Sequence, residues 1–198
     1  MTKGTETRDR ILETAFRLAA REGLEGLSIG QLAEEMKISK SGLFAHFKSK
    51  EELQINTLRV AAERFTQGVL VPAFKEPRGL PRIRALVDRW LRWYTDRALP
   101  GGCLFVAAVF EMDDRPGMVR EVLVELQRQL MAALGKSARI AMDEGHFRRD
   151  LDPAQFAFEF NSILLGFNHS WRLMDDPKAE RRARAAFARL IESSQARS

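Results

Sequence analysis

The chain has 198 residues, with 32 Lys and Arg against 27 Asp and Glu, which gives a formal net charge of +5. Its one cysteine cannot form an intrachain disulfide or a cysteine-based zinc site, so disulfide scaffolds are excluded and a reducing compartment is favoured. Charged residues interrupt every apolar run before the ~18 residues of a membrane span, and residues 1–10 hold no signal-peptide core. We therefore expect a cytoplasmic protein of one or two domains, with no membrane partner.

The spacing of apolar residues predicts an all-α fold. Apolar side chains recur at intervals of three and four along the whole chain, and no segment alternates between apolar and polar residues as a strand would. We expect about nine helices, in chain order over residues 7–21, 28–36, 39–47, 50–70, 80–99, 103–111, 118–144, 152–174 and 178–193.

Local signals mark several of these helix ends. Ser28 and Ser39 are candidate N-caps, and Gln31 stands three residues after Ser28, in the spacing of a capping box. Pro72 is expected to end the fourth helix, because proline interrupts a helix interior. Asp152 followed by proline is a strong start signal for the helix 152–174.

Positive charge is segregated within a neutral N-terminal segment. Residues 1–53 carry nine Lys and Arg and nine Asp and Glu, whereas residues 37–50 hold four lysines, one histidine and no acid. Acids lie directly before and after this stretch, at Glu34, Glu35, Glu51 and Glu52. A solvated charged face is the plain interpretation, but such local clustering is also typical of a surface that binds nucleic acid.

Three short helices at the start of the chain, the last two joined by a tight turn, have the arrangement of a helix-turn-helix. Residues 8–53 resemble the N-terminal DNA-binding domain of the TetR (tetracycline repressor) family. The similarity is carried by Ile11-Leu-Glu-Thr-Ala15, Gly23, Leu27-Ser-Ile-Gly-Gln-Leu-Ala33 and Ile38-Ser-Lys-Ser-Gly-Leu-Phe-Ala-His-Phe-Lys-Ser-Lys-Glu-Glu-Leu53.

The resemblance implies a homodimeric, ligand-responsive regulator of transcription, most commonly a repressor, that binds a palindromic operator in double-stranded DNA. It also implies two domains: a helix-turn-helix DNA-binding domain over residues 1–53 and a helical ligand-binding and dimerisation domain over residues 54–198. The second domain carries no comparably sharp motif, although its length and helical character fit the family.

The residues of the third helix suit a recognition helix. Such a helix exposes small or polar side chains at its N-terminal end and is anchored from behind by apolar residues, here Leu43 and Phe47. Hydroxyls and cations around it are suited to phosphates, although His46 could also be an ordinary surface histidine. The predicted DNA-binding residues are Ser28, Ser39, Lys40, Ser41, Gly42, His46, Lys48 and Lys50.

Three positions depart from the family pattern. Lys37 occupies a turn position where the family usually has glycine, so the turn either accepts a left-handed lysine or changes shape. Gly42 and Phe44 stand where threonine and tyrosine are common. Two hydroxyl contacts to DNA are therefore missing, and no phosphate bond is assigned to Phe44.

The C-terminal region combines large aromatic residues with the polar residues Asn161, Asn168 and His169 inside otherwise apolar helix. Most of these aromatics are core residues by default, but the combination also fits an apolar cavity with a few polar anchors. The family's inducer cavity then implies a small, largely apolar effector. The candidate ligand-binding residues are Trp90, Tyr94, Phe105, Asn161 and His169.

The helix 152–174 is apolar nearly all round, so part of it is expected to face another chain. The last helix carries a second apolar stripe. We expect the two helices to pack against their symmetry mates as a four-helix interface. The predicted interface residues are Phe156, Phe160, Ile163, Leu164, Phe167, Trp171, Ala183, Phe187, Leu190 and Ile191.

Enzymatic function finds little support in the sequence. There is no Gly-rich phosphate loop, Gly-x-Ser-x-Gly or His-Glu-x-x-His motif, and the three histidines lie in separate segments. We expect no metal and no cofactor. Cys103 is expected to be a small buried hydrophobe, with a thiol redox sensor as the alternative. The alternative to a regulator is a small-molecule binding or structural helical protein with a non-functional helix-turn-helix.

Overall fold

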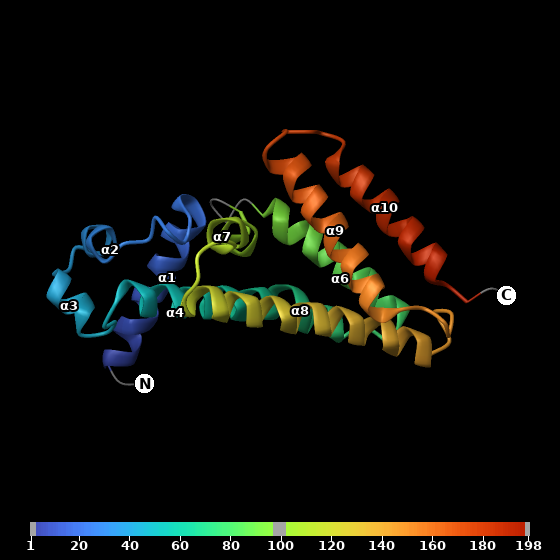
Figure 1. The fold of residues 1–198 in the computed structure, drawn as a ribbon, viewed down its shortest axis with the longest axis horizontal. Coiled ribbons are helices and arrows are strands. Elements are labelled where there is room, and N and C mark those ends of the chain that lie inside the picture. Colours follow the sequence, from blue (N-terminus) through green and yellow to red (C-terminus); the bar gives the residue numbers. More distant parts are fainter. Residues whose placement is uncertain (1–2, 97–101, 197–198) are drawn as a thin grey trace. The chain divides into compact units, whose positions relative to one another are not determined.

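The computed structural model describes residues 3–96 and 102–196, and within those ranges every regular element is a helix (Figure 1). One isolated bridge joins Phe147 and Gln195. The all-α prediction is confirmed. The elements are α1 (Lys3–Glu22), α2 (Ile29–Met36), α3 (Lys40–Phe44), α4 (Lys50–Phe65), the π-helical turn η1 (Thr66–Leu70), α5 (Val71–Phe74), α6 (Leu80–Thr95), α7 (Leu104–Met112), α8 (Met118–Asp143), α9 (Pro153–Arg172) and α10 (Ala179–Ser194).

The predicted helix caps are present. The Ser28 hydroxyl accepts the backbone N–H of Gln31 at 3.2 Å, and Ser39 caps α3 in the same way. The Asp152 carboxylate accepts two backbone N–H groups at the start of α9. The second half of the capping box differs from the prediction, because the Gln31 side chain donates to the Glu22 carboxylate at the end of α1.

Several helix ends differ from the prediction. Helix α1 begins at Lys3 and not near residue 7, and α3 ends at Phe44 and not at residue 47. Helical backbone does not stop before Pro72 but continues through η1 and α5, because proline is tolerated in the first turn of a helix, where its missing N–H has no partner to lose. Gly68 suits the π turn, since a Cβ at that position would lie 3.0 Å from the Trp93 ring. Helix α6 ends at Thr95, and residues 97–99 of the predicted helix 80–99 lie outside the described residues.

The chain divides into two compact units. Unit 1 comprises residues 1–65 and 96–126, and unit 2 comprises residues 66–95 and 127–198. The chain therefore passes between the units after residues 65, 95 and 126. The segment that follows α4 is therefore not the sole covalent connection between the units, since α8 also begins in unit 1 and ends in unit 2. The predicted domain boundary after residue 53 stays a prediction.

Unit 1 is built around α1, which packs against α2, α4 and α7. Ile11 and Ala15 of α1 are fully buried, together with Leu32 of α2 and Leu53 and Leu58 of α4. Burial of each large aliphatic side chain contributes roughly 1.5–3 kcal/mol relative to its exposure. The short helices α2 and α3 are therefore held by their apolar faces, which leaves their polar faces in solvent.

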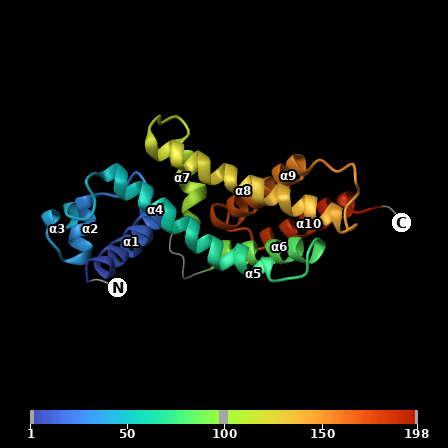
Figure 2. The same cartoon turned by 90° about the horizontal axis from the view of Figure 1, so that it is seen from below.

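Unit 2 has an aromatic core between α6, α9 and α10. Helices α9 and α10 lie side by side (Figures 1 and 2). The Phe160 ring centroid lies 4.8 Å from that of Phe187 on α10 and 6.0 Å from those of Trp90 on α6 and Phe156. The Phe156 ring in turn lies 5.3 Å from that of Phe147, so the cluster extends to the segment before α9.

The turn between α2 and α3 accepts a left-handed lysine. Lys37 has φ 55° and ψ 42°, and its N–H donates to the Glu34 carbonyl at 3.1 Å. This conformation costs a residue with a Cβ roughly 1–2 kcal/mol, and glycine avoids that cost. The turn therefore keeps its usual shape despite the substitution.

We expect Lys37→Gly to raise the free energy of unfolding by about 0.5–1 kcal/mol, because relief of the strain exceeds the added flexibility of the unfolded chain. Urea denaturation of the whole protein measures the change. Lys37→Ala is the matched control, since it removes the same exposed side chain but keeps the Cβ. Equal stability of the two variants would contradict the proposed strain.

Candidate nucleic-acid interface

Helix α3 presents a small polar surface from a firmly anchored base. Residues 39–42 at its N-terminal end are all exposed, whereas Leu43 and Phe47 are each only 1% exposed. The Ser39 and Ser41 hydroxyl oxygens lie 3.0 Å apart, and Ser39 also accepts the N–H of Gly42. The structure thus brings the predicted recognition residues together on one exposed end of a short helix.

Phe47 is held by Arg8 of α1, which also contacts α4. The Arg8 guanidinium of α1 lies over its ring, 5.0 Å from the centroid, and also donates to the Asn56 side-chain oxygen of α4 at 3.2 Å. A cation over an aromatic face is worth about 0.5–1 kcal/mol at an exposed site. These contacts tie the base of α3 to α1 and α4.

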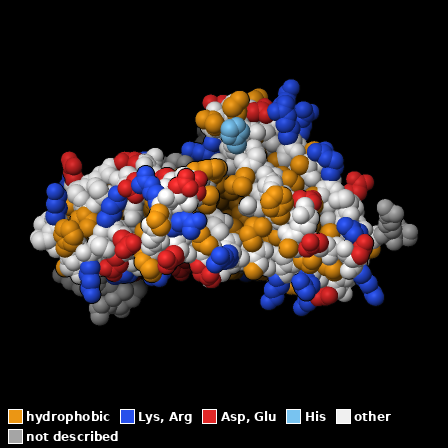
Figure 3. All heavy atoms as spheres, in the orientation of Figure 1, with side chains coloured by type: hydrophobic (Ala, Val, Ile, Leu, Met, Phe, Trp, Pro, Cys, Tyr) orange, Lys and Arg blue, Asp and Glu red, His pale blue; other side chains and the backbone are white. Residues whose placement is uncertain are grey.

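The remaining predicted phosphate donors lie around this end. Ser28 and His46 are half-buried, while Lys40 and Lys48 are exposed and have no ion pair within the described part of the chain. Figure 3 shows Lys and Arg interspersed with Asp and Glu on the visible face. The positions of individual lysines therefore matter more for phosphate binding than the net charge of the chain. Lys40 and Lys48 are therefore available to phosphate.

Lys50 differs from the other lysines because its ammonium is already engaged. Its Nζ donates to the backbone carbonyl of Glu25 at 2.7 Å and to the carboxylate of the same residue at 3.2 Å. No local sequence signal indicates this pair, since the two residues are 25 positions apart.

Comparison with known proteins agrees with this geometry. A family model for bacterial regulatory proteins of the tetR family matches residues 11–55. A second model, for the tetracyclin repressor-like C-terminal domain, matches residues 79–187, more than half of the chain. The chain belongs to the TetR family. It is a DNA-binding transcriptional regulator, which confirms the expectation that it is not an enzyme.

Relatives and solved structures of the TetR family cover most of the chain. The regulator TcmR of Streptomyces glaucescens is 25% identical over 180 residues, which are 88% of this chain and 76% of TcmR. A TetR regulator from Chloroflexus aurantiacus has a TM-score of 0.85 at 23% identity, over 97% of this chain and 96% of that one. AibR, solved with isovaleryl coenzyme A and operator DNA, has a TM-score of 0.71 at 23% identity, over 92% and 95% of the two chains.

The five candidate ligand-binding residues of this TetR-family chain belong to both units and differ in burial. Trp90 and Tyr94 are buried in unit 2, where the Tyr94 ring stacks 6.2 Å from that of Phe167. Phe105 belongs to unit 1, and His169 is exposed near the end of α9. Asn161 is half-buried.

The polar side chain that α9 does direct inward is Asn168. It is 8% exposed, and its amide nitrogen has no hydrogen-bond partner among the described residues. Asn168 follows Phe160 and Leu164 at intervals of four, which places the three on one helix face. That spacing is the signal that distinguishes Asn168 from Asn161 and His169.

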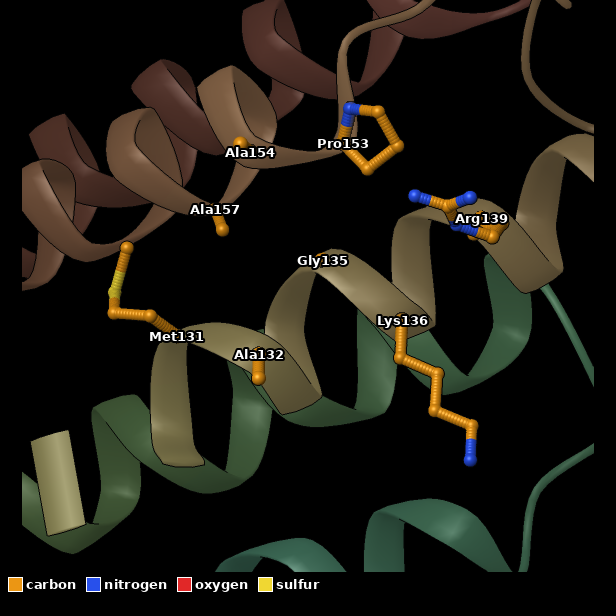
Figure 4. A pocket seen from close by; sticks show the side chains of 8 residues that line it. All are labelled: Met131, Ala132, Gly135, Lys136, Arg139, Pro153, Ala154 and Ala157. Carbon is orange, nitrogen blue, oxygen red and sulfur yellow. The ribbon is translucent and has the colours of Figure 1, made fainter. Parts of the chain in front are cut away.

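A surface groove of about 410 Å³ runs between the C-terminal half of α8 and the start of α9 in unit 2 (Figure 4). Met131 reaches toward α9, Arg139 lies near Pro153, and Lys136 points away from α9. Gly135 permits this approach, since a Cβ there would lie 3.3 Å from the Pro153 carbonyl oxygen. None of the five candidate ligand-binding residues lines this groove.

Most of the predicted dimer-interface residues lie inside one protomer, which corrects that part of the prediction. They pack between α6, α9 and α10, so their side chains have no surface to offer a second chain. Ile163 and Ile191 are half-buried, and Trp171 is 37% exposed. The buried members are Phe156, Phe160, Leu164, Phe167, Ala183, Phe187 and Leu190.

Other apolar side chains of α9 do face outward. Phe158 is 61% exposed and Leu165 is 40% exposed, and both lie on the side of α9 that the aromatic core leaves open. Together they form what we call the α9 outer face. Trp171 is also partly exposed, but it follows Phe167 by one helical turn and stacks on that core ring at 6.2 Å. The sequence could not separate these residues from the core, because both sets are apolar and share one helix.

Cys103 is half-buried at the start of α7 and is not the fully buried hydrophobe that the sequence favoured. Among the described residues, no group of three or more His, Cys, Asp or Glu side chains could hold a metal ion. No helix in the described ranges is long and apolar enough to cross a membrane.

Proposed function

We propose that this TetR-family regulator is a homodimeric, ligand-responsive repressor that acts in the cytoplasm on a palindromic operator. The observation that carries the DNA-binding part is the exposed N-terminal end of α3, with residues 39–42 in solvent above the buried anchors Leu43 and Phe47. A dimer would place two such helices in successive major grooves, about 34–36 Å apart. Double-stranded DNA is therefore the proposed partner.

Selection from a randomised double-stranded DNA pool tests this proposal directly. We expect one palindrome to be enriched, with half-sites about 10–10.5 base pairs apart from centre to centre. Binding that never exceeds the level for random DNA would favour the alternative, a helical binding protein whose helix-turn-helix is non-functional.

We expect Ser41→Ala to change the base preference of the selected site, because Ser41 lies at the exposed end of α3. Lys48→Ala is the matched control, since a phosphate contact should weaken all sequences about equally and lower the salt slope by roughly one unit. The measurement is the base preference selected by each variant. An identical preference for Ser41→Ala and the wild-type protein would remove Ser41 from base readout.

The α9 outer face supports the homodimer. Phe158 and Leu165, seven residues apart, present large apolar side chains to solvent from one face of α9, and such patches are commonly covered by a partner. In a twofold dimer the same face meets itself, so each apolar contact is made twice. The proposed interface thus rests on these exposed residues together with Ile163 and Ile191, and not on the buried core.

The proposed effector is a small, largely apolar molecule bound in unit 2. The buried aromatic rings of Trp90 and Tyr94 and the inward amide of Asn168 support an apolar ligand that carries a hydrogen-bond acceptor. AibR was solved with an acyl coenzyme A, so a TetR-type fold can accept a ligand with an acyl group.

Ligand response would require the effector to favour a dimer spacing that does not fit DNA. A tenfold loss of operator affinity needs about 1.4 kcal/mol of such preference. Both α4 and α8 lead from unit 1 toward unit 2 and are the proposed levers. Thermal-shift screening identifies ligands, and equal operator affinity with and without every confirmed ligand would contradict a sensor role.

A further inference from the structure

The Lys50–Glu25 pair is part of a larger network of polar contacts to the loop between α1 and α2. The Glu25 carboxylate also lies 3.3 Å from the Arg115 guanidinium, which follows α7. The Glu25 N–H donates to the Glu111 carboxylate of α7 at 2.8 Å. The Gln54 side chain of α4 donates to the backbone carbonyl of Leu24, the residue before Glu25, at 2.8 Å. All of these groups belong to unit 1, and they fix Glu25 beside the first turn of α4.

Charge favours an ionised Glu25 in this position. The hydrogen bond from Lys50 is the main cause that lowers the pKa of the Glu25 carboxyl, and the positive charges of Lys50 and Arg115 add to it. The Glu25 carboxylate is therefore ionised at neutral pH, where it forms the ion pair with the Lys50 ammonium. Lys40 and Lys48, by contrast, have no carboxylate partner in the described part of the chain.

A DNA phosphate would compete with Glu25 for the same ammonium. Both are anions that accept charge-assisted hydrogen bonds from a lysine. The pair is partly exposed, with 42% and 46% of the two side chains accessible, so it is of the kind that phosphate can displace. Each phosphate contact made by Lys50 must then be made at the expense of the bond to Glu25.

We propose that Glu25 sets the DNA affinity of this regulator by holding Lys50 back from the phosphate backbone. The proposal rests on the proposed DNA-binding function and identifies a residue outside α3 that tunes it. Glu25 acts through Lys50 and not on DNA itself, which makes it a positioning residue. Its effect is electrostatic, so it should alter affinity and salt dependence without altering base preference.

A double-mutant cycle with Glu25→Gln and Lys50→Ala tests the proposal on the full-length dimer and its selected operator. We expect Glu25→Gln alone to tighten binding about two- to fivefold, as expected for loss of an exposed ion pair. It should also steepen the dependence of log K on log salt by up to about one unit, because Lys50 then displaces a counterion. In the Lys50→Ala background the same change should have no more than the small general effect of removing one negative charge.

Glu35→Gln is the matched control. Glu35 is exposed on α2 and has no ion pair among the described residues, so its replacement removes a charge without releasing a lysine. Any general effect of charge should then appear equally with and without Lys50. Weaker binding by Glu25→Gln, or equal tightening in both backgrounds, would overturn the role of Glu25. Failure of the wild-type protein to select any operator would instead overturn the proposed function.

Discussion

Phe158→Glu is expected to dissociate the proposed homodimer and to abolish cooperative operator binding. Phe158 is 61% exposed on the α9 outer face, so the change should leave the protomer folded. Twofold symmetry would bury one unpaired carboxylate from each protomer in the apolar interface. Each costs roughly 2 kcal/mol of dimerisation free energy, which together corresponds to about a 1,000-fold weaker dimer. Sedimentation velocity at micromolar concentration measures the change.

Met118→Glu is the matched control for this prediction. Met118 is 52% exposed at the start of α8 and belongs to unit 1, so the same kind of substitution is made on an exposed apolar residue that is not part of α9 or α10. It should sediment as a dimer, as the wild-type protein is expected to do. A stable wild-type monomer, or a Phe158→Glu variant that sediments as a dimer, would show that α9 does not form the interface.

Phe160→Ala is expected to lower the free energy of unfolding by about 3–5 kcal/mol, which is a large share of the total for a domain of this size. Only two positions from Phe158, Phe160 is 1% exposed and contacts the rings of Trp90, Phe156 and Phe187. Its removal leaves a cavity that the surrounding helices cannot fill. Urea or thermal denaturation at constant protein concentration measures the loss.

Phe110→Ala controls for the loss of a phenyl ring as such. Phe110 is 71% exposed on α7, so its truncation should change stability by less than about 0.5 kcal/mol. If Phe160→Ala dissociated the dimer without destabilising the protomer, the assignment of Phe160 to the core would be wrong. Together, the two variants at positions 158 and 160 separate the core of α9 from its outer face.

The sequence by itself determined the helical class, most helix ends and the DNA-binding end of the chain. Apolar residues recur at intervals of three and four, and side chains such as Ser28, Ser39 and Asp152 cap the helices. Both signals involve residues within one or two helical turns of each other, so they can be recognised from the local sequence. The residues of α3 were predictable for the same reason, because a recognition helix is one contiguous segment that carries its own polar end and its own anchors.

The tertiary structure alone decided what depends on contacts between distant segments. It divided the apolar residues of α9 into a core around Phe160 and an outer face around Phe158, since an all-round apolar helix does not encode which side its neighbours cover. It assigned Phe105 to a different unit from Trp90. It also paired Lys50 with Glu25, because an ion pair across 25 residues forms only when the fold brings the two segments together.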